Sequence, residues 1–595
     1  MKFVRSVILS ILFTLASASF KDSAQLKITS AKSSPRWAEC GKSCVGRMQL
    51  VDVTLNNTGT SVWITSDDSL QVRIESDKLH TIQPATVKRL RPGDSAIVEI
   101  GVQNTAGVAQ GSTGPATAVA QWSNNNASVA LTFNATYGLP SYSPNPESVN
   151  AHESPDWFKG AKYGIFIHWG VYSVPAYGNT GKNESYAEWY WDHQINPEDP
   201  TMTYQYHLEK YGADVVYDDF IANFTVSNWD PKEWVDLIND AGARYFVPTT
   251  KHHEGFALFD MPSNVSERNS IKQVPHRDLI KELFDAAKKY QPQLHRGTYF
   301  SLPEWFNPAY SKYANGQFGV GPPRNPYTNK TVPYTGFVEV DDFLTDIQLP
   351  QMNILAYDYD TDIMWCDIGG PSLSDDFAAS WLNHALQQNR QVTFNDRCGS
   401  VNGVAINGDY ATPEYASTTS LSPQHWEACR GMDPFSFGYN YMTPDSDYLN
   451  ASSIVTTLVD IISKNGNLLL DIGPKADGTI ASIMQTNLRA AGEWIRAHGE
   501  SIFDTKYWPN GPGSGNFRYT TTNDAFYIHY LVKPGDSLTV PDAVPYLPGD
   551  KVTVVGGSEN GVVVDSRLVG QNLVLSIPED ISSADNYTWT FKISY

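Results

Sequence analysis

Hydrophobic and polar residues alternate along the first part of the chain. From Ala24 to Phe133 the apolar positions have a period of two, and turn-forming runs such as Asn56-Asn57-Thr58-Gly59 recur about every ten residues. A period of two is typical of strands with one buried face, and short strands with regularly spaced turns predict an all-β sandwich. We place this N-terminal β-sandwich at residues 19–137 and a Pro/Ser-rich linker at residues 138–149.

The middle of the chain has helical spacing instead. One stripe falls at positions i, i+3, i+4 and i+7 and consists of Trp234, Leu237, Ile238 and Ala241. A cap at Asp230-Pro231 precedes it, and a buried strand pattern follows over residues 243–250. Repeated strand–helix units imply a parallel sheet. Their total length favours a closed (β/α)8-like TIM barrel, which we place at residues 150–505.

Alternation with a period of two returns after Tyr507. It predicts a second, C-terminal β-sandwich at residues 506–595. The expected fold class is therefore α/β plus all-β, with a barrel between two sandwiches.

The first eighteen residues have the form of a secretory signal peptide. Lys2 and Arg5 precede an apolar run over residues 7–16, and Ala16-Ser17-Ala18 supplies small residues for cleavage. No other segment is apolar for long enough to insert in a membrane. Nine N-glycosylation sequons fit a secreted, N-glycosylated protein; they lie at Asn56, Asn126, Asn134, Asn183, Asn223, Asn264, Asn329, Asn450 and Asn586.

Charge and cysteine content narrow the function further. The chain has 43 basic and 64 acidic residues, a formal net charge of −21, which excludes nucleic acid as a partner. Its five cysteines have no zinc-site spacing, so we predict no metal. Cys40 and Cys44 are close enough to close a short loop, and we predict a second disulfide between Cys398 and Cys429. Cys366, inside a strand pattern, is then the free thiol.

Polar side chains follow several predicted strands where those strands end, which is where parallel barrels carry their active sites. These groups are His168-Trp169, Lys251-His252-His253-Glu254, Tyr299, Trp365-Cys366-Asp367 and Asn395-Asp396-Arg397. Because side chains alternate along a strand, Trp365 and Asp367 share one face and Cys366 takes the other. A carboxylate beside an indole suits a sugar site.

The same residues carry a resemblance to a known family. The motifs are Tyr163-Gly-Ile-Phe-Ile-His-Trp-Gly, Ala187-Glu-Trp-Tyr190, Lys251-His-His-Glu-Gly-Phe256, Asp362-Ile-Met-Trp-Cys-Asp367, Asn395-Asp-Arg397, Trp426-Glu427 and Asn467-Leu-Leu-Leu-Asp-Ile-Gly-Pro474. Together they resemble the secreted α-L-fucosidases of glycoside hydrolase family 29. The resemblance covers roughly residues 150–505 and leaves the N-terminal sandwich outside it.

The resemblance implies a retaining exo-glycosidase, without a cofactor, that removes terminal α-L-fucose from oligosaccharides or glycoconjugates. It assigns Asp367 as the nucleophile and Glu414, in the Thr-Pro-Glu-Tyr context, as the acid/base. Glu427 is the alternative acid/base. The residues expected to bind the sugar are His168, Glu188, Trp189, His252, His253, Tyr299, Trp365 and Arg397.

Two other classes of function stay open at this point. One is a catalytically inactive protein that binds fucose or glycans, and the other is an unrelated hydrolase with the same barrel. The N-terminal sandwich could itself bind glycans. Release of an aglycone from a chromogenic α-L-fucoside separates these alternatives.

Overall fold

The computed structural model describes residues 24–42, 44–123, 126–181, 185–314, 321–416 and 420–595. The predicted signal peptide and the sequon at Asn183 lie outside the described residues. The boundaries that we placed between the three units stay predictions.

The N-terminal strands form two antiparallel four-stranded sheets. The first has the order β1 (Leu26–Glu39), β2 (Arg47–Asn57), β6 (Ser95–Asn104), β4 (Leu79–Gln83), and the second the order β5 (Ala85–Val87), β3 (Leu70–Glu75), β7 (Ser112–Trp122), β8 (Ala127–Tyr137). One apolar core, which includes Val53, Val72 and Ala118, is common to both sheets. The strands predicted from the alternating pattern are thus confirmed.

The C-terminal strands are also antiparallel. A five-stranded sheet has the order β18 (Lys506–Tyr507), β19 (Phe517–Thr521), β20 (Ala525–Tyr530), β25 (Trp589–Ser594), β22 (Val552–Val555). A three-stranded sheet has the order β21 (Ser537–Thr539), β24 (Asn572–Ser576), β23 (Ser566–Val569), and a short helix α12 (Glu579–Ser582) precedes the last strand. A separate apolar core, which includes Phe526, Leu575 and Phe591, is built from both sheets.

Between them lies a curled sheet of seven parallel strands. Its order is β13 (Thr393–Phe394), β12 (Ile363–Asp367), β11 (His295–Ser301), β10 (Tyr245–Lys251), β9 (Tyr163–Ile167), β17 (Gly466–Ile472), β16 (Trp426–Gly431). The expected closed ring of eight strands is wrong, because β13 and β16 do not pair with each other. Residues 410–414 lie between these two edges. Isolated bridges join Tyr410 to Asn395 and Ala411 to Trp426.

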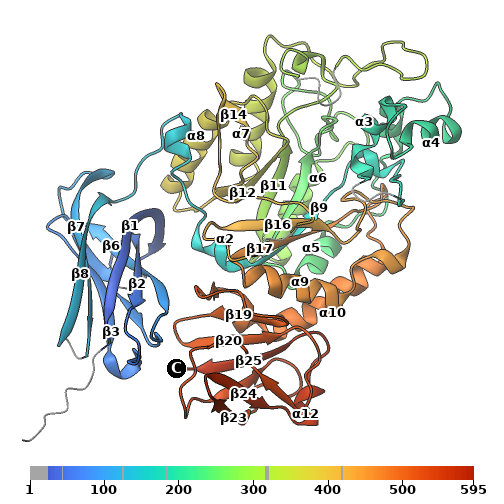
Figure 1. Ribbon diagram of the computed structural model, residues 1–595. Helices are drawn as coiled ribbons and strands as arrows, with labels where there is room; N and C mark the ends of the chain where they lie inside the picture. Colours follow the sequence, from blue (N-terminus) through green and yellow to red (C-terminus); the bar gives the residue numbers. More distant parts are fainter. Residues whose placement is uncertain (1–23, 43, 124–125, 182–184, 315–320, 417–419) are drawn as a thin grey trace, which may run out of the picture.

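Helices cover the outside of this sheet (Figure 1). The main ones are α5 (Pro231–Asp240), α6 (Leu279–Tyr290), α7 (Leu349–Tyr357), α8 (Ser374–Gln387), α9 (Ala451–Ile462) and α10 (Ser482–Ala497). Shorter elements are α1 (Pro146–Val149), within the predicted linker, α2 (Asp156–Ala161), α3 (Tyr190–Ile195), α4 (Thr203–Lys210), α11 (Gly499–Ile502) and the hairpin of β14 (Ser400–Val401) and β15 (Val404–Ala405).

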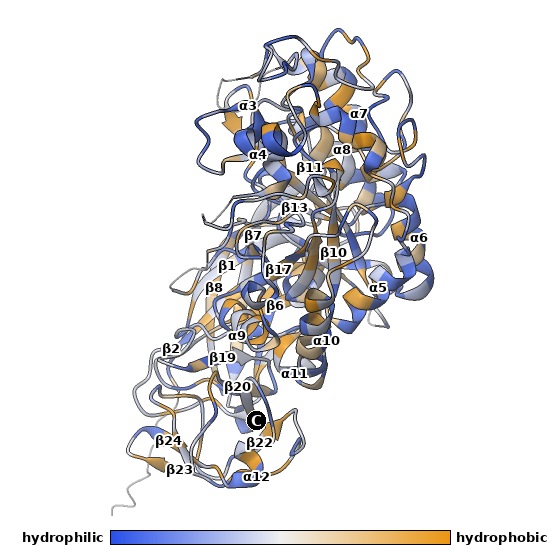
Figure 2. Ribbon diagram, turned by 90° about the vertical axis from the view of Figure 1, so that its right-hand side faces the viewer, coloured by the Kyte–Doolittle hydropathy of each residue, from blue (hydrophilic) through white to orange (hydrophobic). Residues whose placement is uncertain are grey.

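The helix predicted from the apolar stripe is α5. The Asp230 side chain accepts a hydrogen bond of 2.8 Å from the Lys232 amide and caps it, as the sequence predicts. Trp234, Leu237 and Ile238 are buried. Figure 2 shows both hydrophobic and hydrophilic colours along α5 and α6, as expected of helices that pack one face against a sheet.

The two faces of the curled sheet build separate cores. On β12, Ile363 and Trp365 belong to the core inside the curl, whereas Met364 and Cys366 belong to the core under the helices. Strand alternation therefore puts Trp365 and Asp367 on the inner side, as predicted.

The predicted pairing of the barrel cysteines is wrong. Cys366 forms a disulfide with Cys398, with Cα atoms 4.9 Å apart, and Cys429 is the buried free thiol. Cys366 points outward on β12, and Cys398 follows the neighbouring strand β13, so the two meet behind the inner face. Cys429 on β16 belongs to the inner core. The predicted disulfide between Cys40 and Cys44 is present.

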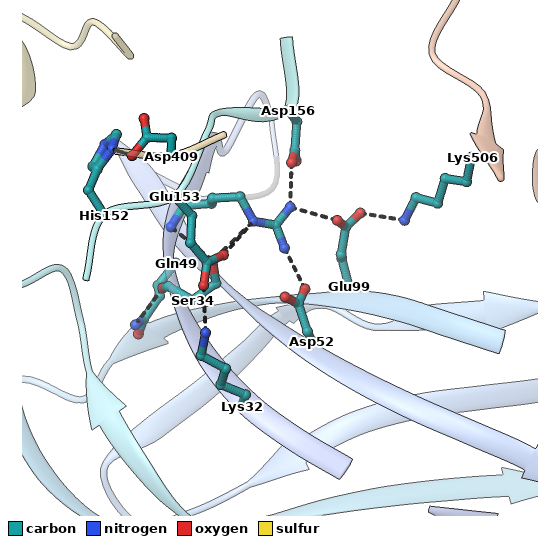
Figure 3. A network of polar contacts seen from close by, with 11 residues as sticks. Lys32, Ser34, Gln49, Asp52, Glu99, His152, Glu153, Asp156, Asp409 and Lys506 are labelled. Atoms are coloured by element: carbon teal, nitrogen blue, oxygen red, sulfur yellow. Dashed lines mark hydrogen bonds and ion pairs between the residues drawn. The ribbon is translucent and has the colours of Figure 1, made fainter. Parts of the chain in front are cut away.

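A buried arginine connects the N-terminal sheets to the barrel (Figure 3). The Arg36 side chain is 4% exposed and contacts Asp52 on β2 at 2.5 Å and Glu99 on β6 at 2.7 Å. It also contacts Asp156 on α2, and Glu99 in turn binds Lys506 of the C-terminal sheet at 2.9 Å. One guanidinium thus touches two of the units, and Glu99 extends the contact to the third.

Candidate active site

A small cavity opens among the carboxyl ends of the parallel strands. Its lining includes all ten residues that the sequence assigns to the site, together with Phe166, Tyr186, Ile368, Cys429 and Phe437. Residues on β9, β11 and β12, or directly after β9 and β10, reach it because parallel strands end at the same rim.

Asp367, the last residue of β12, has three polar side chains beside its carboxylate, and the Ile368 amide donates to its Oδ1 at 2.8 Å. Tyr299 Oη donates a hydrogen bond of 2.7 Å to its Oδ2, and Arg397 Nη1 lies 3.0 Å from its Oδ1. His253 Nε2 lies 3.7 Å from Oδ2. The carboxylate is thus held in one orientation by groups from three segments.

Glu414 lies on the irregular segment that fills the gap between β13 and β16. The backbone of β16 fixes this segment, since the Tyr415 amide donates to the Cys429 carbonyl at 2.9 Å and the Cys429 amide donates to Pro413 at 3.1 Å. Burial raises the pKa of the Glu414 carboxyl; the Asp367 charge adds to the rise and Arg397 opposes it. A raised pKa suits a group that must carry a proton.

Arg397 links the two carboxylates. Its Nη1 contacts both Asp367 Oδ1 and Glu414 Oε1. The guanidinium carbon lies 5.0 Å from the centre of the Trp365 ring. The structure thus pairs Arg397 with both carboxylates; its contact with the sugar stays a prediction.

Glu427 does not line the cavity. It is fully buried and accepts hydrogen bonds from Trp365 Nε1 at 2.9 Å and Tyr245 Oη at 2.5 Å. Burial raises the pKa of its carboxyl to about 7, and the two hydrogen bonds oppose the rise. Its position behind the indole favours Glu414 as the acid/base.

Three histidines form one wall of the cavity. His168 Nδ1 lies 2.7 Å from Asp471 Oδ1, and His253 Nδ1 lies 2.7 Å from Ser301 Oγ. His252 Nδ1 is 3.2 Å from Glu254 Oε2. Because each Nδ1 is engaged, the Nε2 atoms are oriented by these contacts.

Glu188 brings a third carboxylate to the cavity. Its Oε2 accepts hydrogen bonds from Ser436 Oγ at 3.0 Å and from the Gly438 amide at 2.8 Å. Its Oε1 is buried and has no hydrogen-bond partner among the described residues. That oxygen can accept a hydrogen bond from a sugar hydroxyl.

Several residues of the site are not predicted from the sequence. Phe166 shares a strand face with His168, and Asp471 is near the end of β17, so alternation and the strand-end rule could have found both. Tyr186 and Phe437 lie outside the strands, where no periodic pattern marks them. Among the described residues no three His, Cys, Asp or Glu side chains gather as a metal site requires.

The family comparison decides the class of this site. The model of the α-L-fucosidase family matches residues 130–500. The chain belongs to the α-L-fucosidase family. Its activity is that of an α-L-fucosidase, a glycoside hydrolase. The match leaves β1 through β7 outside the family model.

Individual relatives agree with the family match. The α-L-fucosidase of Dictyostelium discoideum is 34% identical over 76% of this chain and 95% of its own. The plasma α-L-fucosidase of Homo sapiens is 33% identical over 62% of this chain and 73% of its own. The crystal structure of the α-fucosidase of Thermotoga maritima in complex with fucose has a TM-score of 0.61 and 30% identity, and covers 76% of this chain and all of that one.

None of the helices in the described ranges has both the length and the apolar character needed to cross a bilayer.

Proposed function

We propose that this α-L-fucosidase works by double displacement, with Asp367 as the nucleophile and Glu414 as the acid/base. The supporting observation is that one nitrogen of Arg397 contacts an oxygen of each carboxylate. Two oxygens that share one donor lie at most about 6 Å apart. Retaining glycosidases separate their carboxyls by about 5–5.5 Å and inverting ones by about 6.5–9.5 Å.

In the first step, protonated Glu414 gives its proton to the glycosidic oxygen while Asp367 attacks the anomeric carbon. The bond to the leaving alcohol breaks as the fucosyl ester forms. In the second step, ionised Glu414 takes a proton from water, and the water oxygen displaces Asp367 from the anomeric carbon. Glu414 regains its proton, so the enzyme returns to its starting state.

The remaining cavity residues hold the fucose. Glu188 Oε1 accepts from a ring hydroxyl, and the oriented His168, His252 and His253 bind others. Trp365 and Trp189 supply aromatic surface for the sugar ring. Because these residues surround two carboxylates that share the Arg397 guanidinium, the site favours a catalytic protein over one that only binds fucose.

The substrate is a fucosylated oligosaccharide or glycoconjugate outside the cell. Two disulfides suit an oxidising compartment. Seven of the eight sequon asparagines that lie in the described ranges have exposed side chains, and Asn56 is half-buried. Endoglycosidase treatment of protein from a eukaryotic host should lower its mass.

The mechanism is tested by the configuration of the first product. The enzyme acts on an aryl α-L-fucoside, and NMR spectra are recorded before the product mutarotates. Retention requires α-L-fucose to appear first. The β anomer as first product would reject double displacement and leave the hydrolase activity untouched.

A further inference from the structure

Four tyrosines form an aromatic surface outside the cavity, here called the tyrosine surface: Tyr177, Tyr206, Tyr211 and Tyr441. The rings of Tyr177 and Tyr206 are stacked, with centroids 3.7 Å apart and planes 4° from parallel. The Tyr441 ring lies 6.4 Å from both, with its hydroxyl 3.1 Å from that of Tyr206. The Tyr211 ring stands edge-on to Tyr206 at 6.2 Å.

The tyrosine surface is partly open to solvent, because Tyr441 is exposed and Tyr177, Tyr206 and Tyr211 are half-buried. Exposed apolar residues stand close to these tyrosines in the sequence. Tyr441 is 45% exposed and Met442 is 43% exposed. On α4 and just before it, Leu208 and Met202 are 42% and 48% exposed. Single exposed apolar side chains are ordinary; the four clustered tyrosine rings are what distinguishes this surface.

Two chain segments connect the tyrosine surface to the cavity. Phe437 lines the cavity, and Tyr441 is four residues further, at most about 14 Å along the chain. The Tyr441 amide donates to the Ala176 carbonyl at 2.9 Å. Figure 1 shows α3 and α4 together on the same side of the molecule as the loops that follow the parallel strands.

A second contact also places the tyrosine surface close to the cavity. A side-chain carbon added to Gly178, next to Tyr177, would lie 3.0 Å from Ser185 Oγ. Ser185 directly precedes Tyr186, which lines the cavity. The tyrosine surface is therefore within the reach of an oligosaccharide of a few units whose end sits in the cavity.

The chemistry of the surface fits a carbohydrate. Tyrosine rings offer apolar faces for the C–H faces of pyranoses, and their hydroxyls bind sugar hydroxyls at the edge. The side chain has few rotatable bonds, so holding it against a ligand costs little entropy. The cavity takes only a terminal fucose, so the rest of the glycan must leave it across the neighbouring surface.

We propose that the tyrosine surface is a second carbohydrate-binding site, which holds the oligosaccharide to which the fucose is attached. The proposal rests on the proposed function, because it takes the cavity as the fucose site. It adds a preference for extended fucosylated oligosaccharides over small fucosides.

Kinetics with two substrates test the proposal. Tyr441→Ser is compared with Tyr357→Ser, a control that changes a 37% exposed tyrosine on α7. With mixed lacto-N-fucopentaoses, Tyr441→Ser should lower kcat/KM about five- to tenfold, mainly through KM. With an aryl α-L-fucoside the two variants should match the parent. An equal effect of Tyr441→Ser on both substrates, or none on the pentasaccharides, overturns the proposal.

Direct binding separates this proposal from the catalytic one. Saturation-transfer NMR with the fucose-free tetrasaccharide lacto-N-tetraose should show contacts in the parent and weaker ones in Tyr441→Ser. Absence of contacts in the parent would overturn the second site even if the enzyme hydrolyses aryl fucosides. Sedimentation showing self-association that Tyr441→Ser abolishes would instead assign the surface to a second copy of the chain.

Discussion

The indole Nε1 of Trp365 donates a hydrogen bond of 2.9 Å to the buried carboxyl of Glu427. The same indole is stacked at 17° and 5.5 Å on Tyr299, which donates to Asp367. The guanidinium carbon of Arg397 lies over the Trp365 ring as well, 5.0 Å from its centre. Glu427 is therefore placed to orient, through Trp365, the groups that hold both carboxylates of the cavity.

Replacement of Glu427 should show whether this orientation matters. Glu427→Gln keeps an oxygen acceptor for the indole and should keep kcat on an aryl fucoside within about tenfold. Glu427→Leu removes the acceptor and should lower kcat about a hundredfold with little change in KM, because small displacements of reacting groups are costly. Full activity of the leucine variant would refute the positioning role.

The Glu427 carboxyl also has a consequence for stability. Burial raises its pKa from 4.5 to about 7. The folded chain thus holds this proton more tightly than the unfolded one, so its contribution to the free energy of unfolding falls as pH rises from about 4.5 to 7. Urea unfolding at pH 5 and pH 8 should show a smaller loss for Glu427→Gln than for the parent. An equal loss would mean that this carboxyl does not titrate differently on folding.

Removal of the proposed nucleophile has a distinct signature. Asp367→Ala should lower kcat on aryl fucosides by at least about a thousandfold while the thermal unfolding profile stays cooperative. Added azide fits the vacated space and should restore turnover, with fucosyl azide of inverted configuration as the product. If the variant hydrolyses substrate as fast as the parent, another group attacks the anomeric carbon.

The effect of removing the proposed acid/base should depend on the leaving group of the substrate. Glu414→Ala should be severely slow on fucosides with alcohol leaving groups, which need a proton, yet form the fucosyl-enzyme at a near-normal rate from activated aryl fucosides. Azide should then speed the second step and give fucosyl azide of retained configuration. Glu427→Ala is the matched control, and finding this pattern there instead would exchange the roles of the two glutamates.

Alternation along β12 was enough to predict that Trp365 and Asp367 share the inner face and that Cys366 faces outward. It could not predict the disulfide, because a periodic pattern does not reveal the order of strands in a sheet. The neighbour of β12 is β13, which Cys398 follows, and not β16, which carries Cys429. The same limit applies to the segment around Glu414, whose isolated bridges replace a regular strand. Tyr186 and Phe437 reach the cavity from loops, where tertiary contacts alone decide their place.

The disulfide between Cys366 and Cys398 ties together the residues next to Asp367 and Arg397. Cys366→Ala with Cys398→Ala should lower the free energy of unfolding by roughly 4 kcal/mol, because the unfolded chain regains the entropy of a 32-residue loop. Without the disulfide, Arg397 is held less firmly beside the two carboxylates. We therefore expect kcat on aryl fucosides to fall as well. Cys40→Ala with Cys44→Ala is the control, because that disulfide closes a much shorter loop, between β1 and β2. Equal kcat in both double variants would show that the bond serves stability only.

Arg36 holds the N-terminal sheets against the rest of the molecule. Burial alone would raise the pKa of Glu99, but the charges of Lys506 and Arg36 overcome it and lower the pKa to about 2. Arg36→Met leaves Asp52 and Glu99 without their shared partner, which should cost about 3–5 kcal/mol of unfolding free energy. The part of this loss that comes from Glu99 should be complete above about pH 4.5, the ordinary pKa of the group, and should shrink as the pH falls towards about 2, its pKa in the folded chain.

The test is thermal unfolding and limited proteolysis at pH 7, with Arg73→Met as the control. Arg73 pairs with Glu75 in the same sheets but is 30% exposed, so its loss should cost less than about 1 kcal/mol. Arg36→Met should release fragments cut between the N-terminal strands and the barrel, while kcat on an aryl fucoside at low temperature stays at the parent value. If Arg36→Met unfolds no more easily than Arg73→Met, the junction does not depend on this guanidinium.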